Sequence, residues 1–189
     1  LDETQRNPDS AFLIVCPASL VYNWEQEIRR FAPALPVQTV AGNAGEREAV
    51  LKEVGPGVLI TSYDLLKRDV MWYQDRKFRF QILDEAQYIK NPATQGAKAV
   101  KMIQSQTRFA LTGTPIENRL SELWSIFEYL MPGFLHTYSG FKKKFELPIV
   151  RDGDRRALED LRRLTGPFIL RRMKQDVLKE LPPKEEDKE

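Results

Sequence analysis

Short apolar runs alternate with stretches of helical periodicity along this chain. Five runs, each bounded by turn residues, predict strands at residues 12–16, 37–40, 58–61, 80–83 and 109–112. Several of them are apolar almost throughout, which is typical of strands in a parallel sheet that is covered on both faces. A helical spacing separates the apolar residues Val21, Trp24, Ile28 and Phe31, and a thinner stripe predicts a second helix at residues 97–104. This repeated order of strand and helix predicts a doubly wound α/β domain.

The pattern changes in the last third of the chain. A strongly apolar helix is predicted at residues 120–131, and a Pro-Gly pair ends it. No further strand is indicated beyond that point, whereas Leu158, Leu161 and Leu164 predict a helix rich in arginine. We therefore predict an α/β domain at residues 1–131, a helical insertion at 132–167, and a closing segment that leads into a linker at 168–189.

Composition is that of a globular protein with an uneven distribution of charge. Of the 189 residues 42% are hydrophobic, and the formal net charge is only +2. Residues 141–174 nevertheless hold eleven Lys and Arg against five Asp and Glu, and they include Lys142, Lys143 and Lys144. Such a cluster can contact a phosphate backbone, and it is equally consistent with a solvated helical face.

The single cysteine and the single histidine exclude several kinds of site. Cys16 alone cannot support a disulfide framework or a cysteine metal site, and its apolar neighbours predict a core position. With His136 as the only histidine, neither a histidine metal centre nor a Ser-His or Cys-His nucleophile system is predicted. No apolar run has the length that a bilayer requires, so no membrane partner is expected.

Polar turns follow four of the predicted strands. They contain Ser19, Thr61 and Ser62, Asp84 and Glu85, and Thr112, Gly113 and Thr114. In an open parallel sheet, ligands bind beyond the carboxyl ends of the strands. The four turns together therefore predict a site at this edge of the sheet.

The adjacent acids Asp84 and Glu85 are the candidates for phosphoryl-transfer chemistry. Transfer from ATP needs a magnesium ion that neutralises phosphate charge and a positioned water. Asp84 is expected to hold magnesium, in part through water, and Glu85 to orient or deprotonate the attacking water. The alternative is an ordinary acidic turn at the start of a helix, and for a bare Asp-Glu pair that alternative is favoured.

The hydroxyl-bearing turns also admit two interpretations. Ser19, Thr61 and Ser62 can donate to nucleic-acid phosphates, or they can cap the helices that follow, and both can hold together. The glycine between Thr112 and Thr114 permits a tight turn, which could serve a site or simply cap the next segment. A search for the phosphate-loop pattern G-x-x-x-x-G-K-[ST] finds no match, so the sequence itself supplies no cradle for ATP phosphates.

Five segments resemble the motifs of one family. Residues 14–24 (IVCPASLVYNW) are similar to its motif Ia, and residues 60–64 (ITSYD) to motif Ib. Residues 83–91 (LDEAQYIKN) are similar to motif II, and residues 111–124 (LTGTPIENRLSELW) to motif III with its characteristic extension. Residues 168–184 resemble the segment that closes the first lobe. Together they resemble the Swi/Snf family of DNA-dependent ATPases in helicase superfamily two.

This resemblance implies a partial RecA-like P-loop NTPase lobe, with the helical insertion forming a protrusion, that drives translocation along duplex DNA. ATP and Mg²⁺ would be the cofactors, with Asp84 and Glu85 catalytic and Gln87 beside the nucleotide. Thr112, Gly113 and Thr114 would couple hydrolysis to DNA contact. The expected DNA-binding positions are Pro17, Ser19, Thr61, Ser62, Tyr63, Asn118, Arg119, Lys142, Lys143 and Lys144.

The departures from the family pattern limit what this chain is expected to do alone. The phosphate loop of the family lies before motif Ia and its second RecA-like lobe lies after the closing segment, and this sequence contains neither. We therefore expect a piece of a larger ATPase that does not turn over ATP by itself. Its expected partners are duplex DNA, the second lobe and DNA-bound proteins.

Other interpretations stay open from the sequence. The chain could be an inactive DNA- or protein-binding module that has lost its phosphate loop. It could also belong to another superfamily-two motor, such as a restriction-enzyme motor subunit, although the motif III extension argues against this. A glutamine at Gln87 favours a bacterial or archaeal branch, which predicts location in the cytoplasm at the nucleoid; a eukaryotic protein would be nuclear.

Overall fold

The computed structural model describes residues 10–113 and 120–172 of the chain. The chain divides into two compact units, Leu1–Phe141 and Lys142–Glu189, and each is considered by itself. The second unit begins at Lys142, whereas the sequence pattern places a boundary at residue 132. The extent of the helical insertion therefore stays a prediction.

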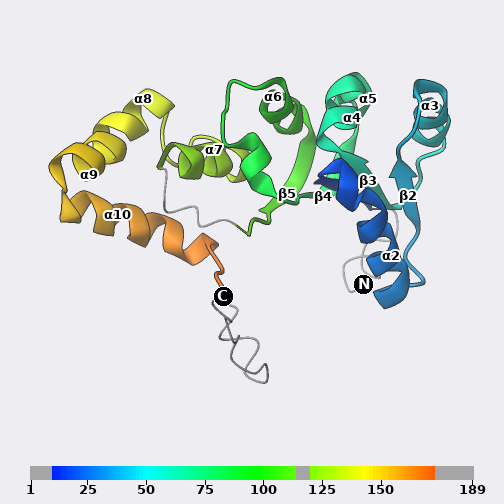
Figure 1. The fold of residues 1–189 in the computed structure, drawn as a ribbon, viewed down its shortest axis with the longest axis horizontal. Coiled ribbons are helices and arrows are strands. Elements are labelled where there is room, and N and C mark those ends of the chain that lie inside the picture. The colour runs from blue at the N-terminus through cyan, green and yellow to red at the C-terminus, as the bar shows by residue number, and fades with distance from the viewer. Residues whose placement is uncertain (1–9, 114–119, 173–189) are drawn as a thin grey trace, which may run out of the picture. The chain divides into compact units, whose positions relative to one another are not determined.

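A five-stranded sheet forms the centre of the first unit, and all of its strand pairs are parallel (Figure 1). Its strands are β1 (Ala11–Cys16), β2 (Val37–Val40), β3 (Gly57–Ser62), β4 (Lys77–Leu83) and β5 (Gln104–Ala110). The spatial order is β2-β3-β1-β4-β5. Ile14 at the centre of β1 pairs with Ile60 of β3 on one side and with Ile82 of β4 on the other. The predicted parallel α/β architecture is confirmed.

Helices connect the strands, and local sequence signals set where several of them begin. Between the strands lie α2 (Val21–Phe31), α3 (Ala44–Lys52), α4 (Tyr63–Arg68), α5 (Val70–Gln74) and α6 (Gln95–Met102), and α7 (Leu120–Leu130) and α8 (Tyr138–Phe141) follow β5. Asn43 and Glu46 form a reciprocal capping box at α3, and the hydroxyls of Ser62 and Thr94 cap α4 and α6. In the part of the chain that the structure describes, no helix combines the length and apolar character needed to cross a bilayer.

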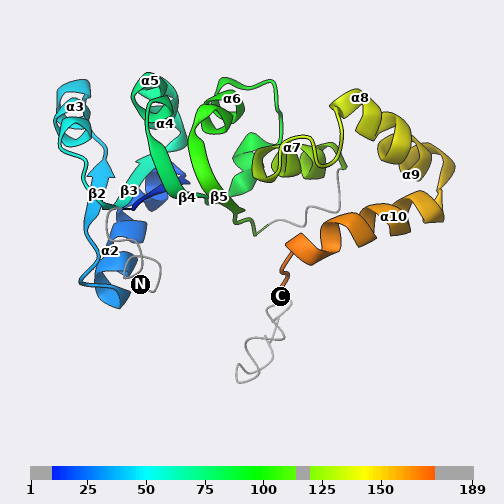
Figure 2. The same ribbon diagram turned by 180° about the vertical axis from the view of Figure 1, so that it is seen from behind.

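The two faces of the sheet are covered unequally. Figures 1 and 2 show α2 on one side and α3, α4, α5 and α6 on the other. Leu13 and Val15 point into the larger core, whereas Ile14 packs on the α2 side. On that second side Phe109 of β5 keeps 43% of its surface exposed. The predicted coverage of both faces therefore holds around β1 and β3 but not at β5.

Strand β5 differs most from its prediction. The apolar signal placed it at residues 109–112, whereas it runs from Gln104 to Ala110. None of its seven residues is buried, and among the described residues it pairs only with β4. A strand at the end of a sheet can have a polar sequence, because its pairing needs the backbone and not apolar side chains. The predicted helix before it correspondingly ends at Met102 instead of residue 104.

The second unit is helical where it is described. A π-helical segment at Lys142–Glu146 precedes α9 (Leu147–Asp152) and α10 (Arg155–Thr165). The Asp154 carboxylate caps α10 by accepting the backbone N–H groups of Arg156 and Ala157 at 2.9 and 3.1 Å. Leu161 on α10 is buried while the four arginines of this helix are exposed, so its two faces are chemically distinct.

Replacing Leu13 with alanine should lower the free energy of unfolding by about 2–5 kcal/mol, because it opens a cavity at the centre of β1. Leu13 has no exposed surface, whereas Met71, the control position, is 66% exposed. Met71→Ala should change stability by less than about 0.5 kcal/mol. Urea unfolding followed by circular dichroism measures both, and equal effects would contradict the assigned core.

Candidate functional site

The carboxyl end of β4 is held between its two neighbouring strands. The backbone N–H of Asp84 donates to Val15 O at 2.8 Å, and that of Ala86 donates to Leu111 O at 2.8 Å. Leu111 N–H in turn donates to Leu83 O at 2.8 Å. These bonds place the turn that carries the acidic pair beside the ends of β1 and β5, as the sequence predicted for parallel strands.

Asp84 is fixed by contacts from several elements. Its Oδ2 accepts a hydrogen bond from the indole N–H of Trp24 on α2 at 2.8 Å. Its Oδ1 accepts the backbone N–H of Glu85 at 2.9 Å, and its backbone oxygen accepts the Tyr63 hydroxyl at 2.7 Å. Each carboxylate oxygen can accept more than one hydrogen bond, so the group keeps capacity for a further ligand.

Glu85 occupies a left-handed backbone conformation, with φ 49° and ψ 53°. This region is costly for a residue with a side chain and is found most often where the surroundings impose it. The Glu85 carboxylate accepts a hydrogen bond from the Gln87 amide nitrogen at 2.5 Å. Asp84 and Glu85 therefore contact different partners, although they are adjacent in the chain.

Gln87 links the acidic pair to the turn after β5. Its amide nitrogen donates to Glu85, and its amide oxygen accepts the hydroxyl of Thr112 at 2.9 Å. The side chains of Glu85, Gln87 and Thr112 thus form a continuous hydrogen-bonded chain across the ends of β4 and β5. Gly113 is exposed beside it, while Thr114, Asn118 and Arg119 lie outside the described residues.

Buried neutral groups lie below the acidic pair. Burial, followed by the negative charge of Asp84, raises the pKa of the Tyr63 hydroxyl well above its usual range. The same two causes raise the pKa of the Cys16 thiol to about 12. Tyr63 also stacks on Tyr88, with ring centroids 4.9 Å apart. Both the hydroxyl and the thiol therefore stay protonated at neutral pH.

The side chains predicted to contact DNA from the ends of β1 and β3 have different surroundings. Ser19 is exposed on the 3-10 turn Ala18–Leu20, whereas Pro17 before it is buried. Thr61 is fully buried and its hydroxyl donates to Val40 O at 3.3 Å. Ser62 is buried as the cap of α4, so the capping interpretation is confirmed for Ser62, whereas no side chain caps the helix that follows Ser19. In this conformation the side chains of Thr61, Ser62 and Tyr63 are occupied inside the unit.

In the second unit, the predicted basic residues Lys142, Lys143 and Lys144 are all exposed. They lie on the π-helical segment before α9. Lys144 Nζ lies 5.2 Å from the centroid of the Phe145 ring, whose side chain is buried. A buried neighbour anchors the segment while its three ammonium groups face solvent.

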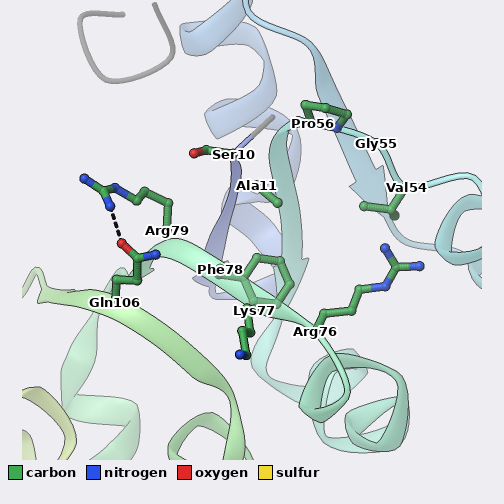
Figure 3. A pocket seen from close by; sticks show the side chains of 10 residues that line it. All are labelled: Ser10, Ala11, Val54, Gly55, Pro56, Arg76, Lys77, Phe78, Arg79 and Gln106. Atoms are coloured by element: carbon green, nitrogen blue, oxygen red, sulfur yellow. Dashed lines mark hydrogen bonds between the residues drawn. The ribbon is translucent and has the colours of Figure 1, made fainter. Parts of the chain in front are cut away.

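A cavity among the described residues lies at the opposite edge of the sheet (Figure 3). Its volume is about 480 Å³, and it is lined by Ser10, Ala11, Val54, Gly55, Pro56, Arg76, Lys77, Phe78, Arg79 and Gln106. Arg79 donates a hydrogen bond to Gln106 across it. No residue that the sequence marks as a site residue lines this cavity, so it is separate from the acidic pair.

Comparison with known proteins agrees with this geometry. Residues 1–188 match the SNF2-related domain family. The chain belongs to the SNF2-related family. Over 93% of its length it superimposes on the Sulfolobus solfataricus SWI2/SNF2 ATPase core in complex with dsDNA, with a TM-score of 0.83 and 42% identity, and covers 36% of that chain. The sheet with its acidic pair therefore has the fold of the RecA-like lobe of a SWI2/SNF2 ATPase core.

Relatives of this SNF2-related domain occur in different kingdoms. It is 43% identical over 172 residues to an uncharacterized ATP-dependent helicase of Mycoplasma genitalium, covering 91% of this chain and 16% of that protein. It is 40% identical over 184 residues to the TATA-binding protein-associated factor MOT1 of Saccharomyces cerevisiae, covering 91% of this chain and 10% of that protein. The chain thus spans less than a fifth of either curated relative. Because a yeast protein matches almost as well as a bacterial one, the expectation of a bacterial or archaeal branch is not supported.

The acidic pair of this SNF2-related domain fits a hydrated magnesium ion better than a protein-caged metal. Asp84 and Glu85 are half-buried, and neither forms an ion pair with a described residue. Among the residues that the structure describes, no group of three His, Cys, Asp or Glu could surround a metal. Magnesium usually keeps several waters and takes one or two carboxylates from the protein, which agrees with this arrangement.

Sequence patterns missed two residues that hold Asp84. The sequence pattern places Trp24 on the apolar face of a helix and Tyr63 among the expected DNA contacts, whereas both donate hydrogen bonds to Asp84. Trp24 lies on the apolar face of α2, and its spacing does not distinguish an indole that only packs from one that also donates. The polar tip that Trp and Tyr carry on a large apolar body is the signal that could have suggested these bonds.

The raised pKa of Cys16 predicts very slow thiol chemistry in the folded chain. At pH 8 a disulfide reagent such as DTNB should react with native Cys16 at least about a hundredfold more slowly than with the chain unfolded in urea, because the thiolate is the reactive form. The control is Cys16→Ala combined with Ser19→Cys, which places the only thiol on the exposed turn. Absorbance at 412 nm measures both rates, and equal rates in the two native proteins would contradict the burial of Cys16.

Proposed function

We propose that this chain is part of the first RecA-like lobe of an ATP-dependent translocase that moves along duplex DNA or remodels protein–DNA complexes. The observation that carries the proposal is the hydrogen-bonded chain of Glu85, Gln87 and Thr112 beside Asp84. This hydrogen-bonded chain joins the ends of β4 and β5, which in this family would meet nucleotide and DNA. The membership in the SNF2-related family and the likeness to a duplex-bound ATPase core support the same function.

In the proposed mechanism Asp84 and Glu85 have different roles. A magnesium ion, when bound with ATP, neutralises phosphate charge. Asp84 would hold the shell of that ion, because its carboxylate is oriented by Trp24 and by the Glu85 N–H and still has acceptor capacity. Glu85 would accept a proton from the attacking water or orient it. Gln87 would set the direction of the Glu85 carboxylate through its 2.5 Å hydrogen bond.

The link from Gln87 to Thr112 supports a coupling role for the turn after β5. Any displacement of this turn would change the hydrogen bond that Gln87 accepts, and with it the partner of Glu85. Thr112, Gly113 and Thr114 are therefore proposed to relate hydrolysis to DNA contact. The hydrogen bond to Gln87 supports this proposal for Thr112, Gly113 is exposed next to it in the chain, and Thr114 lies outside the described residues.

Duplex DNA is the proposed ligand of two exposed surfaces. Ser19 is exposed on the turn at the end of β1, where its hydroxyl can donate to a phosphate. Lys142, Lys143 and Lys144 offer three exposed charges. Pro17, Thr61, Ser62 and Tyr63 are proposed to shape the first surface from below and not to touch the phosphates, because their side chains are buried. Asn118 and Arg119 keep their proposed DNA contacts from the motif resemblance alone.

The second RecA-like lobe and DNA-bound proteins are the proposed partners of the larger protein. A relative bears the name TATA-binding protein-associated factor, which supports a protein target on DNA for that relative. The target of the present protein would be set by segments other than this one. Its location follows from DNA binding, at the nucleoid in a prokaryote or in the nucleus of a eukaryote.

The isolated chain should not release phosphate from ATP, even with magnesium and excess duplex DNA, because its sequence holds no G-x-x-x-x-G-K-[ST] pattern to cradle the phosphates. A sensitive phosphate-release assay measures this, with Glu85→Gln as the control for contaminating ATPase. Release that Glu85→Gln abolishes would overturn the prediction. If a longer protein that contains this chain also lacks a phosphate loop and releases no phosphate from ATP, the alternative of an inactive DNA-binding module would be favoured.

Duplex binding by the isolated chain should weaken steeply with salt. If Lys142, Lys143 and Lys144 each contact a phosphate, changing all three to Gln should reduce the log–log salt slope by up to about three, because each contact releases about one counterion. Fluorescence anisotropy with a labelled duplex measures the slope. The matched control changes three other exposed lysines, Lys52, Lys77 and Lys98, to Gln.

Equal slopes for the wild type and the first variant would assign the lysine cluster to a solvated face. No duplex binding at low salt would contradict the DNA-binding part of the proposal.

A further inference from the structure

Trp24 lies between the exposed turn after β1 and the acidic pair. Helix α2 begins at Val21, directly after the 3-10 turn Ala18–Leu20, so the turn and the helix form one continuous segment. Leu20 N–H donates to Pro17 O at 2.9 Å and closes the turn. Trp24 follows one helical turn after the exposed Ser19 turn, and it packs against the smaller core.

The indole N–H of Trp24 is committed to Asp84 and not to a backbone group. The distance of 2.8 Å from Nε1 to Oδ2 is that of a charge-assisted hydrogen bond. An indole can donate but cannot accept, so it fixes the direction of one carboxylate oxygen without offering an alternative arrangement. Leu or Phe could fill the same apolar space, so packing alone does not account for an indole here.

The other contacts of Asp84 constrain its backbone more than its carboxylate. Val15 O accepts its N–H, and the Tyr63 hydroxyl donates to its backbone oxygen. The N–H of Glu85 reaches Oδ1 from the next residue in the chain. Among the described residues, Trp24 is therefore the one side chain from another element that holds the Asp84 carboxylate.

We propose that Trp24 is a positioning residue that couples duplex binding at the Ser19 turn to the orientation of the Asp84 carboxylate. A displacement of the turn moves α2, and the Trp24 hydrogen bond passes that displacement to Oδ2. By reciprocity, a change at Asp84 alters the affinity of the turn for DNA. The proposal rests on the proposed duplex binding and adds a link through α2 that is separate from the Gln87–Thr112 link.

A double-mutant cycle on duplex affinity tests this coupling. Trp24→Phe keeps an aromatic ring and removes the donor, and Asp84→Asn keeps the shape and removes the charge. The general electrostatic effect of removing the Asp84 charge is the same in both backgrounds and cancels in the cycle. We expect the effect of Asp84→Asn on the dissociation constant to differ at least about fivefold between the wild-type and Trp24→Phe backgrounds.

Trp124 supplies a matched control. Its indole N–H also forms a hydrogen bond in the first unit, but to the backbone oxygen of His136 at 3.1 Å. Trp124→Phe removes the same kind of donor without removing a hydrogen bond to Asp84. Its effect on duplex affinity should be additive with that of Asp84→Asn.

A spectroscopic measurement keeps the test independent of the stability of Trp24→Phe. In ¹H–¹⁵N spectra of the wild-type chain, unlabelled duplex should shift the indole resonance of Trp24 and leave that of Trp124 in place. Asp84→Asn should move the Trp24 resonance before DNA is added, because its acceptor changes from a carboxylate to an amide.

The outcomes separate this inference from the proposed function. If the wild-type chain does not bind duplex DNA, both the coupling and the proposed DNA binding are contradicted. Binding with additive Trp24→Phe and Asp84→Asn effects, or with an unmoved Trp24 resonance, would overturn the coupling and leave duplex binding intact. Non-additivity for Trp24 together with additivity for Trp124 would support it.

Discussion

The structure depends on the hydrogen bonds that hold the chain just beyond β4. Asp84 is bound to β1 through Val15 O, and two residues later Ala86 is bound to the segment after β5 through Leu111 O. Glu85 lies between these two attachments and takes a left-handed conformation. With both ends of a three-residue turn fixed to opposite neighbours, the backbone between them has little freedom, and the directions of the two acidic side chains follow from it.

That conformation has an energetic consequence. A left-handed residue other than glycine costs of order 1–3 kcal/mol and persists only when its surroundings over-determine it. Here the surroundings are the central strands of the sheet, whose residues Leu13, Val15 and Leu83 are fully buried. The large core therefore does more than stabilise the fold, because it maintains a strained turn that places Glu85 within reach of Gln87.

Much of this arrangement could be predicted from the sequence, and the exceptions have physical reasons. The runs around β1, β3 and β4 are apolar because both faces are covered, so periodicity located them and the polar turns at their ends. β5 is an end strand with polar residues from Gln104 to Thr107, and its pairing left no apolar signal there. Thr61 and Tyr63 are residue types that often contact DNA, but their side chains point into the unit. Their directions are set by their positions at the end of β3 and the start of α4, which residue type alone does not reveal. The bond from Trp24 to Asp84 joins residues sixty positions apart, which no local pattern can indicate.

The neutral groups beneath the acidic pair explain why its charge can be directed outward. The Cys16 thiol and the Tyr63 hydroxyl stay protonated because burial disfavours their anions and Asp84 disfavours them further. The Tyr63 hydroxyl consequently remains a donor to the Asp84 backbone, and Cys16 donates weakly to Thr61 O at 3.8 Å. No cation among the described residues pairs with Asp84 or Glu85. Because the groups on the inner side are neutral donors and no described cation pairs with the carboxylates, the two carboxylates remain acceptors at the edge of the sheet. A ligand that brings its own positive charge is the complementary partner there.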